Sequence, residues 1–395
     1  MQPPETASVG ILPIGALGVA FHHHLTSREA QPGRVVFLSR HASAKGDRWQ
    51  GQSKVTVETP EGSHDLPLAG RLEGTLAEAA HGDRLPGIVL VCTNPDQLFG
   101  VVADYVAVIE HEHRENRLSD APASLPLLVL CANGIYFQRI RSSFIELLEE
   151  STLLGRLPDL WPDLMPRVVG RLVRGITIQT AMRRGSGTSA VYKPGPPGRT
   201  LLAGGDRTAR AAAVRLLAER GGWFEDAGEV SPTRAEFNKA LVNLAMNVLG
   251  QLAAIDPDGR FRPLTVGEIR RHVPRARIIE LVEAVTDVGR GVGVFGESDS
   301  PAEVLRSLEQ ALETTSSHVP SSLQLLQQHL ADGSLGPGMA PTEKWLLQPL
   351  QHYARSLSDT AAFNYFENLE RDLTAALERA AAAPRAAVGT PPDSP

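Results

Sequence analysis

The chain has 395 residues, a net charge of −6 and two cysteines, with 42% hydrophobic and 21% charged residues. This length exceeds that of a typical domain with one hydrophobic core, so we expect two domains. The composition is that of a globular protein. No dense basic run marks a surface for nucleic acid or an anionic membrane, and no apolar stretch approaches the ~20 residues of a membrane span. No basic segment precedes the first apolar run, so no signal peptide is expected. We expect a cytoplasmic protein that binds neither nucleic acid nor membrane.

The first third of the chain alternates short apolar runs with amphipathic stretches, which is typical of βαβ units around a parallel sheet. Four runs are expected to be strands: VGILPI, RVVFLSR, GIVLVCT and LPLLVLCANG. The last three of these runs end in polar or small residues, and ligands of such sheets bind at the carboxyl ends of strands. Between the second and third runs, KVTVETPEGSHDLPL predicts a hairpin inserted into this sheet, with its turn at Pro60–Gly62.

Farther along, from Val168, the pattern changes to two longer β-like segments, RLVRGITIQTAMRRG and SAVYKPGPPGRTLLAGG, which predict an antiparallel pair. After Gly205 the apolar residues recur at i, i+3 and i+4, so the rest is expected to be helical. We expect an α/β domain over 1–205, a helical domain over 206–380 and a disordered, Pro-rich tail over 381–395.

A glycine turn joins the first expected strand to the first helix. Gly15 and Gly18 occupy the second and third glycine positions of a dinucleotide-binding loop, where backbone meets pyrophosphate and helix packs on strand. The first position holds Pro13, which has no N–H, so that turn must be built differently. The loop predicts cofactor contacts from Gly15, Ala16, Leu17 and Gly18, and an ordinary strand and turn is the alternative.

The second expected strand ends in Ser39 and Arg40. An NAD-binding protein usually carries an acidic residue roughly 20 positions after the loop, where it binds the ribose 2′-hydroxyl. Arg40 instead suits a 2′-phosphate, which favours NADPH over NADH. A solvated surface arginine is the alternative.

One helical segment, EFNKALVNLAMNVLGQL, carries polar residues in an unusual pattern. Lys239, Asn243 and Asn247 follow one another at four-residue steps, so they form one stripe of a single helix beside apolar positions. The stripe is compatible with a lysine and two amides in a cleft, or with a solvated polar face.

At this helix the sequence resembles the ketopantoate reductase family, also called 2-dehydropantoate 2-reductases. Phe237, Lys239, Asn243 and Asn247 match the family's aromatic residue, lysine and two asparagines. The glycine loop, LSR, VCTNPDQL, LVLCANGI and HVPSSLQ follow in the family's order, so that the likeness spans most of residues 8–350.

The resemblance implies a Rossmann-like NADP-binding domain, an all-helical C-terminal domain of the 6-phosphogluconate dehydrogenase type, and a substrate cleft between them. It also implies NADPH-dependent reduction of 2-dehydropantoate to pantoate, a step toward pantothenate and coenzyme A. Lys239 would then be the general acid that protonates the substrate carbonyl oxygen as hydride arrives. Glu343, in APTEKW, would be a carboxylate that assists this lysine.

Further site residues are carried over from the family by motif. Asn243, Asn247 and Ser322 would hold substrate oxygens, and Asn133 would lie between nicotinamide and substrate. Asn94 stands where the family has a lysine, and with Gln97 it would contact the cofactor.

Other functions stay open beside this one. Pro13 and Asn94 motivate a non-catalytic relative that binds a nucleotide or metabolite, and a 2-oxoacid or opine-type dehydrogenase with another substrate is a third reading. The resemblance is also compatible with a homodimer.

Two sets of potential ligands are not expected to bind a metal. Cys92 and Cys131 lie in apolar runs and are expected to be buried thiols. His111 and His113 flank Glu112 in a charged run that we expect to be a solvated, loop-like segment.

Overall fold

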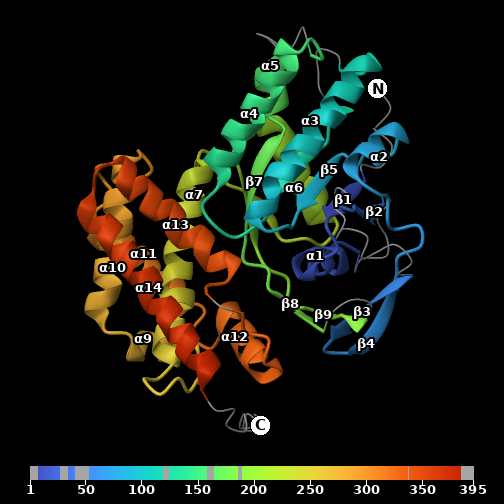
Figure 1. Cartoon of the computed structure of the whole chain (residues 1–395). Coiled ribbons are helices and arrows are strands. Elements are labelled where there is room, and N and C mark those ends of the chain that lie inside the picture. The colour runs from blue at the N-terminus through green and yellow to red at the C-terminus, as the bar shows by residue number, and fades with distance from the viewer. Residues whose placement is uncertain are drawn as a thin grey trace. The chain divides into compact units, whose positions relative to one another are not determined.

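The computed structural model describes residues 8–26, 34–40, 53–118, 124–157, 164–185, 189–336 and 338–383. The chain forms two compact units, Met1–Ala235 and Glu236–Pro395. The first unit combines strands and helices and the second is helical, which confirms the expected fold class (Figure 1). No helix among the described residues has both the length and the apolar character needed to cross a membrane.

A seven-stranded sheet organises the first unit, in the order β11-β10-β7-β6-β5-β1-β2. Its strands are β1 (Val9–Leu12), β2 (Val35–Phe37), β5 (Ile88–Val91), β6 (Leu127–Leu130), β7 (Leu172–Thr177), β10 (Thr200–Ala203) and β11 (Phe224–Asp226). The strands β2, β1, β5, β6 and β7 are mutually parallel, whereas β10 runs antiparallel to β7. Every residue of β1, β5 and β6 is buried, as parallel strands covered on both faces require.

Among the described residues, six α-helices alternate with the strands of the first unit along the chain. They are α1 (Ala16–Thr26), α2 (Leu76–His81), α3 (Leu98–Arg114), α4 (Phe137–Leu153), α5 (Leu164–Val169) and α6 (Arg207–Glu219). Apolar residues of α1 and α6 share one core with the strands, while α3 and α4 pack on each other. Figure 1 shows α4 and α5 close together in the same unit.

The expected hairpin forms, but in a second sheet of order β4-β3-β9-β8. Its strands are β3 (Lys54–Thr59), β4 (Gly62–Pro67), β8 (Ala181–Arg184) and β9 (Val191–Pro194). Thr59 pairs with Gly62, so the predicted turn is confirmed, whereas insertion of the hairpin into the main sheet is wrong. The reason is burial: Val55 and Val57 on alternate positions of β3 join the core that α1 also contacts.

The later β-like segments form the predicted antiparallel pair, but each segment divides between the two sheets. β7 pairs with β10 in the main sheet, and β8 pairs with β9 in the small one. The paired segments therefore connect the two sheets of the first unit.

The first unit extends beyond the boundary expected at 205. The strand β11 pairs with β10, Thr200 opposite Phe224, and α6 packs beside them, so these residues complete the sheet unit up to Ala235. At the other end of the chain, α14 (Thr360–Ala382) includes the first residues of the expected tail. The tail from residue 384 onward lies outside the described residues.

The second unit is built around a helix that changes its pitch. The helix α7 (Pro232–Asn243) passes through a π turn, Leu244–Val248, into α8 (Leu249–Ala254). The other helices are α9 (Val266–His272), α10 (Arg275–Gly291), α11 (Pro301–Glu313), α12 (Ser321–Asp332), α13 (Pro341–Ser356) and α14. The ring of Phe237 lies 6.0 Å from that of Phe295 and 6.2 Å from that of Tyr353, so α7 is part of the apolar core.

His22 of α1 is a polar residue inside the first unit's core. It is 1% exposed, its ring stacks on Phe37 at 4.6 Å, and neither ring nitrogen has a hydrogen-bond partner among the described residues. Burial, with the positive charges of Arg71 and His23, lowers its pKa from 6.5 to about 4. The folded protein therefore holds this imidazole neutral.

Replacement of this histidine should reduce the acid sensitivity of the fold. The unfolded chain takes up a proton near pH 6.5 and the folded chain near pH 4, so stability is lost as pH falls through this window. The expected loss is about 3 kcal/mol. His22→Phe keeps a ring on Phe37 and removes this loss, which urea denaturation across the window measures. An identical pH dependence in both proteins would contradict the assignment.

Candidate functional site

Four of the predicted site residues lie at one edge of the main sheet. Gly15, Arg40, Asn94 and Asn133 follow β1, β2, β5 and β6, and the carboxyl ends of these parallel strands share an edge. The strand β1 lies between β2 and β5, so the direction of winding reverses beside it. Open α/β sheets bind ligands at such a switch point.

The two glycines of the first turn meet different geometric requirements. A Cβ on Gly18 would lie 2.4 Å from the carbonyl oxygen of Pro13 and 3.1 Å from Cγ2 of Ile11, so a side chain there would separate α1 from the strand. A Cβ on Gly15 would meet no atom within 4 Å, so the backbone there borders open space. Ala16 and Leu17 open α1, whose first N–H groups have no acceptor within the helix.

Beyond β2 and β5 the edge presents polar side chains. Arg40 is half-buried, and no hydrogen bond or ion pair joins it to another described residue. Asn94 is exposed at the start of a short 3₁₀ turn, Pro95–Gln97. Gln97 is half-buried, and its carboxamide oxygen accepts a hydrogen bond from the hydroxyl of Thr93.

The segment after β6 presents one side chain to solvent. From Cys131 to Phe137 every residue is buried except Asn133, which is exposed. The backbone of this segment contacts Arg174 of the neighbouring strand β7, a residue that sequence reasoning missed. The sequence signal that could have identified Arg174 is its position as the one charged residue in the strand LVRGIT.

In the second unit the predicted stripe persists, but not on a single α-helix. Lys239 and Asn243 lie on α7, whereas Asn247 lies in the π turn. On an α-helix, residues four positions apart are rotated about 40° beyond one full turn around the helix axis. The π turn is wider, with i→i+5 hydrogen bonds, so a four-residue step across it rotates side chains back in the opposite direction. The π turn therefore returns Asn247 toward the line of Lys239.

Glu343, in the first turn of α13, is a buried carboxyl group beside this helix. Its Oε1 accepts a hydrogen bond from Nε2 of Gln251 at 3.2 Å, and its Oε2 has no hydrogen-bond partner in the described part of the chain. Burial raises its pKa to about 7. Sequence reasoning missed Gln251, although it continues the stripe four residues after Asn247. The expected proximity of Glu343 to Lys239 stays a prediction.

Ser322 is another residue of this unit with a buried polar atom that lacks a partner in the described part of the chain. Its Oγ is buried and has no hydrogen-bond partner among the residues described, and its helix α12 packs against the π turn and α8. Polar groups from α12, α13 and the π-turn helix thus lie on elements that pack together.

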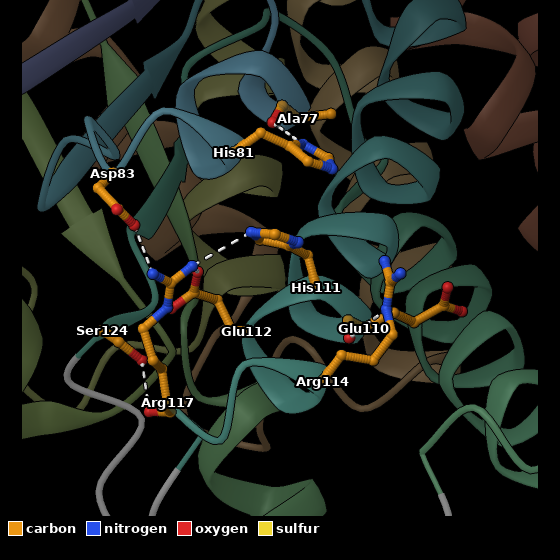
Figure 2. Close-up of polar contacts among 9 residues, drawn as sticks. All are labelled: Ala77, His81, Asp83, Glu110, His111, Glu112, Arg114, Arg117 and Ser124. Carbon is orange, nitrogen blue, oxygen red and sulfur yellow. Dashed lines mark hydrogen bonds and ion pairs between the residues drawn. The ribbon is translucent and has the colours of Figure 1, made fainter.

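The charged run near His111 is not a solvated loop, so that expectation is wrong. His111 and Glu112 are buried in the last turn of α3 (Figure 2). Nη2 of Arg117 donates to Oε1 of Glu112 at 2.9 Å and to Nε2 of His111 at 3.1 Å, and Nη1 donates to Asp83. Because α3 starts after the carboxyl end of β5 and runs back along the sheet, this cluster lies at the end of α3 away from the glycine turn.

Cys92 and Cys131 are free thiols at the ends of the neighbouring strands β5 and β6. Cys131 is buried and Cys92 is half-buried. Desolvation of the sulfur, together with its interaction with the neighbouring Cys131 thiol, raises the pKa of the Cys92 thiol. The described part of the chain contains no group of three or more side chains arranged to hold a metal ion.

Comparison with known proteins identifies solved structures that have a similar fold. No family model and no curated protein matches the chain. Solved structures do match, among them D-mandelate dehydrogenase with NADH and anilino(oxo)acetate, at TM-score 0.62 and 16% identity over 94% of this chain and 98% of that one. A PanE/ApbA family ketopantoate reductase from Ralstonia eutropha JMP134 matches at TM-score 0.58 and 15% identity over 94% and 99%. A probable 2-dehydropantoate 2-reductase from Bacillus subtilis matches at 0.55 and 14% over 93% and 99%.

These similarities confirm the fold that the resemblance to ketopantoate reductases implied. At 14–16% identity they concern the fold alone, because one fold can host many different functions. The chain has the fold shared by ketopantoate reductases and D-mandelate dehydrogenase.

Substitution of the two glycines of the first turn should affect stability to different extents. Gly18→Ala should lower the free energy of unfolding by about 1–3 kcal/mol, because the new methyl group meets a backbone carbonyl that cannot rotate away. Gly15→Ala, the matched control, should change it by less than roughly 0.5 kcal/mol. Urea denaturation measures both, and equal effects would contradict the packing difference.

The raised pKa of Glu343 predicts a pH dependence of the opposite sign to that of His22. The unfolded chain loses this proton near pH 4.5 and the folded chain near pH 7, so the protein loses stability as pH rises between them. The expected loss is about 3 kcal/mol. Glu343→Gln should flatten this part of the stability curve, measured by urea denaturation from pH 4.5 to 7.5. Glu367→Gln, on the exposed side of α14, is the control for loss of one carboxylate, and equal curves for both variants would refute the assignment.

Proposed function

We propose that this protein is an NAD(P)-dependent oxidoreductase that reduces a 2-oxoacid, with NADPH as the preferred cofactor and 2-dehydropantoate as the leading substrate. The observation that carries the proposal is the turn at Gly15 and Gly18, which opens a helix at the switch point of a parallel sheet and borders open space. The matching structures solved with NADH, and with NADH and anilino(oxo)acetate, support the same class of reaction.

Residues of the first unit would hold the cofactor. The turn at Gly15, Ala16 and Leu17 leaves backbone N–H groups and space for a pyrophosphate. Arg40 would bind a 2′-phosphate, which is the basis for preferring NADPH. Asn94, Gln97 and Asn133 follow the next two parallel strands and would contact the rest of the dinucleotide.

Residues of the second unit would serve the substrate. A reduced nicotinamide supplies hydride to the C2 carbonyl. Negative charge then develops on the carbonyl oxygen, and the ammonium group of Lys239 would stabilise it and donate the proton. Asn243 and Asn247 would hold substrate oxygens by their carboxamides.

Ser322 and Glu343 would complete this set. Each has a buried oxygen with no hydrogen-bond partner among the described residues, so each could accept or donate a bond to a substrate oxygen. Glu343 would also be the carboxylate that assists Lys239.

Pro13 and the exposed Asn94 keep a non-catalytic, nucleotide-binding role as the second candidate. A homodimer also stays a prediction, although one matching structure, of ketopantoate reductase from Staphylococcus aureus, is described as dimeric. Location in the cytoplasm likewise stays a prediction.

The first test is cofactor binding followed by turnover. Fluorescence titration should give a lower Kd for NADPH than for NADH, and Gly15→Ala should weaken binding without loss of stability. Absorbance of the reduced nicotinamide should then fall with 2-dehydropantoate, or with another member of a panel of short, branched and aryl 2-oxoacids. No binding would refute the proposal, and binding without turnover across the panel would favour the non-catalytic role.

Lys239→Ala tests the assigned chemistry. Loss of the general acid should lower kcat by about 10²- to 10⁴-fold with the Kd for NADPH nearly unchanged. Lys344→Ala, which removes an exposed lysine of the same unit, is the matched control. Equal turnover by both variants would show that Lys239 has another role.

A further inference from the structure

Strand β7, in which every residue is buried, carries an arginine. Arg174 is 1% exposed, and its backbone lies between Leu130 of β6 and Ala203 of β10. A buried guanidinium is costly unless its N–H groups are bonded. The bonds that Arg174 makes therefore indicate what the residue does.

The guanidinium of Arg174 donates to backbone carbonyls at the end of β6, in the segment after β6 and in β7 itself. Nη1 donates to the carbonyl oxygens of Leu130 and Gly175, each at 2.6 Å, and Nη2 donates to those of Ala132 at 2.8 Å and Gly134 at 3.4 Å. Ala132 and Gly134 are the residues on either side of Asn133. One side chain thus binds the backbone before and after the exposed asparagine.

Tyr136 reinforces this arrangement from the same segment. Its ring lies under the guanidinium, 4.4 Å from the ring centre to Cζ of Arg174, and its hydroxyl donates to the carbonyl oxygen of Ala132 at 3.1 Å. A planar guanidinium can stack on a ring and serve several carbonyls at once, which an ammonium group cannot do.

The bonds also determine how the segment faces outward. In a planar trans peptide the carbonyl and the following N–H point in opposite directions. With the carbonyls of Ala132 and Gly134 directed to Arg174, the N–H groups of Asn133 and Ile135 point away from it. Gly134 has φ of +121°, a conformation that glycine adopts most readily, and Asn133 is the one exposed residue from Cys131 to Phe137.

We propose that Arg174, with Tyr136, is a positioning residue that holds the backbone on both sides of Asn133, so that the Asn133 carboxamide is presented in one orientation to nicotinamide and substrate. The proposal rests on the proposed reductase function. The alternative is that Arg174 only stabilises the unit and does not act through Asn133. The experiments below distinguish a positioning role from this purely structural role.

The first experiment does not depend on catalysis. Hydrogen–deuterium exchange of the full chain should show roughly 10-fold faster exchange in residues 131–136 of Arg174→Lys, because an ammonium group cannot keep all the bonds that the guanidinium makes to these carbonyls. Arg171→Lys is the matched control, since Arg171 donates to the carbonyl of Leu125 before β6, at the other end of the strand. Unchanged exchange in residues 131–136 of Arg174→Lys would overturn the proposal.

The second experiment is a double-mutant cycle in kcat. Asn133→Ala and Arg174→Lys should each lower kcat by about 10- to 100-fold, and the double variant should be no slower than the slower single one. If the two decreases in kcat multiply in the double variant, Arg174 does not act through Asn133, and the proposal is overturned.

Two provisions keep the proposal testable if a variant does not fold or the wild-type protein is inactive. If Arg174→Lys does not fold, Tyr136→Phe takes its place, because it removes the hydroxyl bonds to the carbonyls of Leu130 and Ala132 and keeps the ring under the guanidinium. If the wild-type protein reduces no 2-oxoacid, the proposed function fails, whereas the exchange experiment still decides whether Arg174 holds the segment.

Discussion

Parallel pairing of β1, β2, β5, β6 and β7 is the constraint on which the first unit depends. Parallel neighbours need crossover connections, and the helices of those connections bury both faces of the sheet. The same polarity places the segments after β1, β2, β5 and β6 at one edge. The glycine turn, Arg40, Asn94 and Asn133 are therefore brought together by the direction of the strands, before any of their own contacts is considered.

The second unit is subject to a different constraint, because one of its helices carries polar groups into an apolar bundle. Phe237 packs with Phe295 and Tyr353, while Asn247 and Gln251 of the same continuous helix are buried and polar. Burial of such groups costs free energy unless they are hydrogen-bonded. The Gln251–Glu343 bond offsets part of this cost. One oxygen each of Ser322 and Glu343 has no hydrogen-bond partner among the described residues, so a ligand could bind to them.

Much of the fold follows from sequence patterns, and the exceptions have physical causes. Continuous apolar runs predicted β1, β5 and β6, and helical periodicity predicted α10 and α11, because these patterns state which faces must be buried. The same patterns do not state which partner covers a face. The hairpin β3–β4 therefore joined β9 in the small sheet, and the run at His111 became a buried turn of α3 held by Arg117.

For the candidate site, the sequence by itself determined the glycines of the first turn, the polar residues after the parallel strands, and the stripe from Lys239 to Asn247. Each is a local pattern, set by backbone geometry within a few residues. Only the tertiary structure decided that Arg174 holds the segment around Asn133, that a π turn lies within the stripe, and that Glu343 is buried against Gln251. Those two residues are 92 positions apart, and burial raises a pKa only when distant segments meet and exclude water.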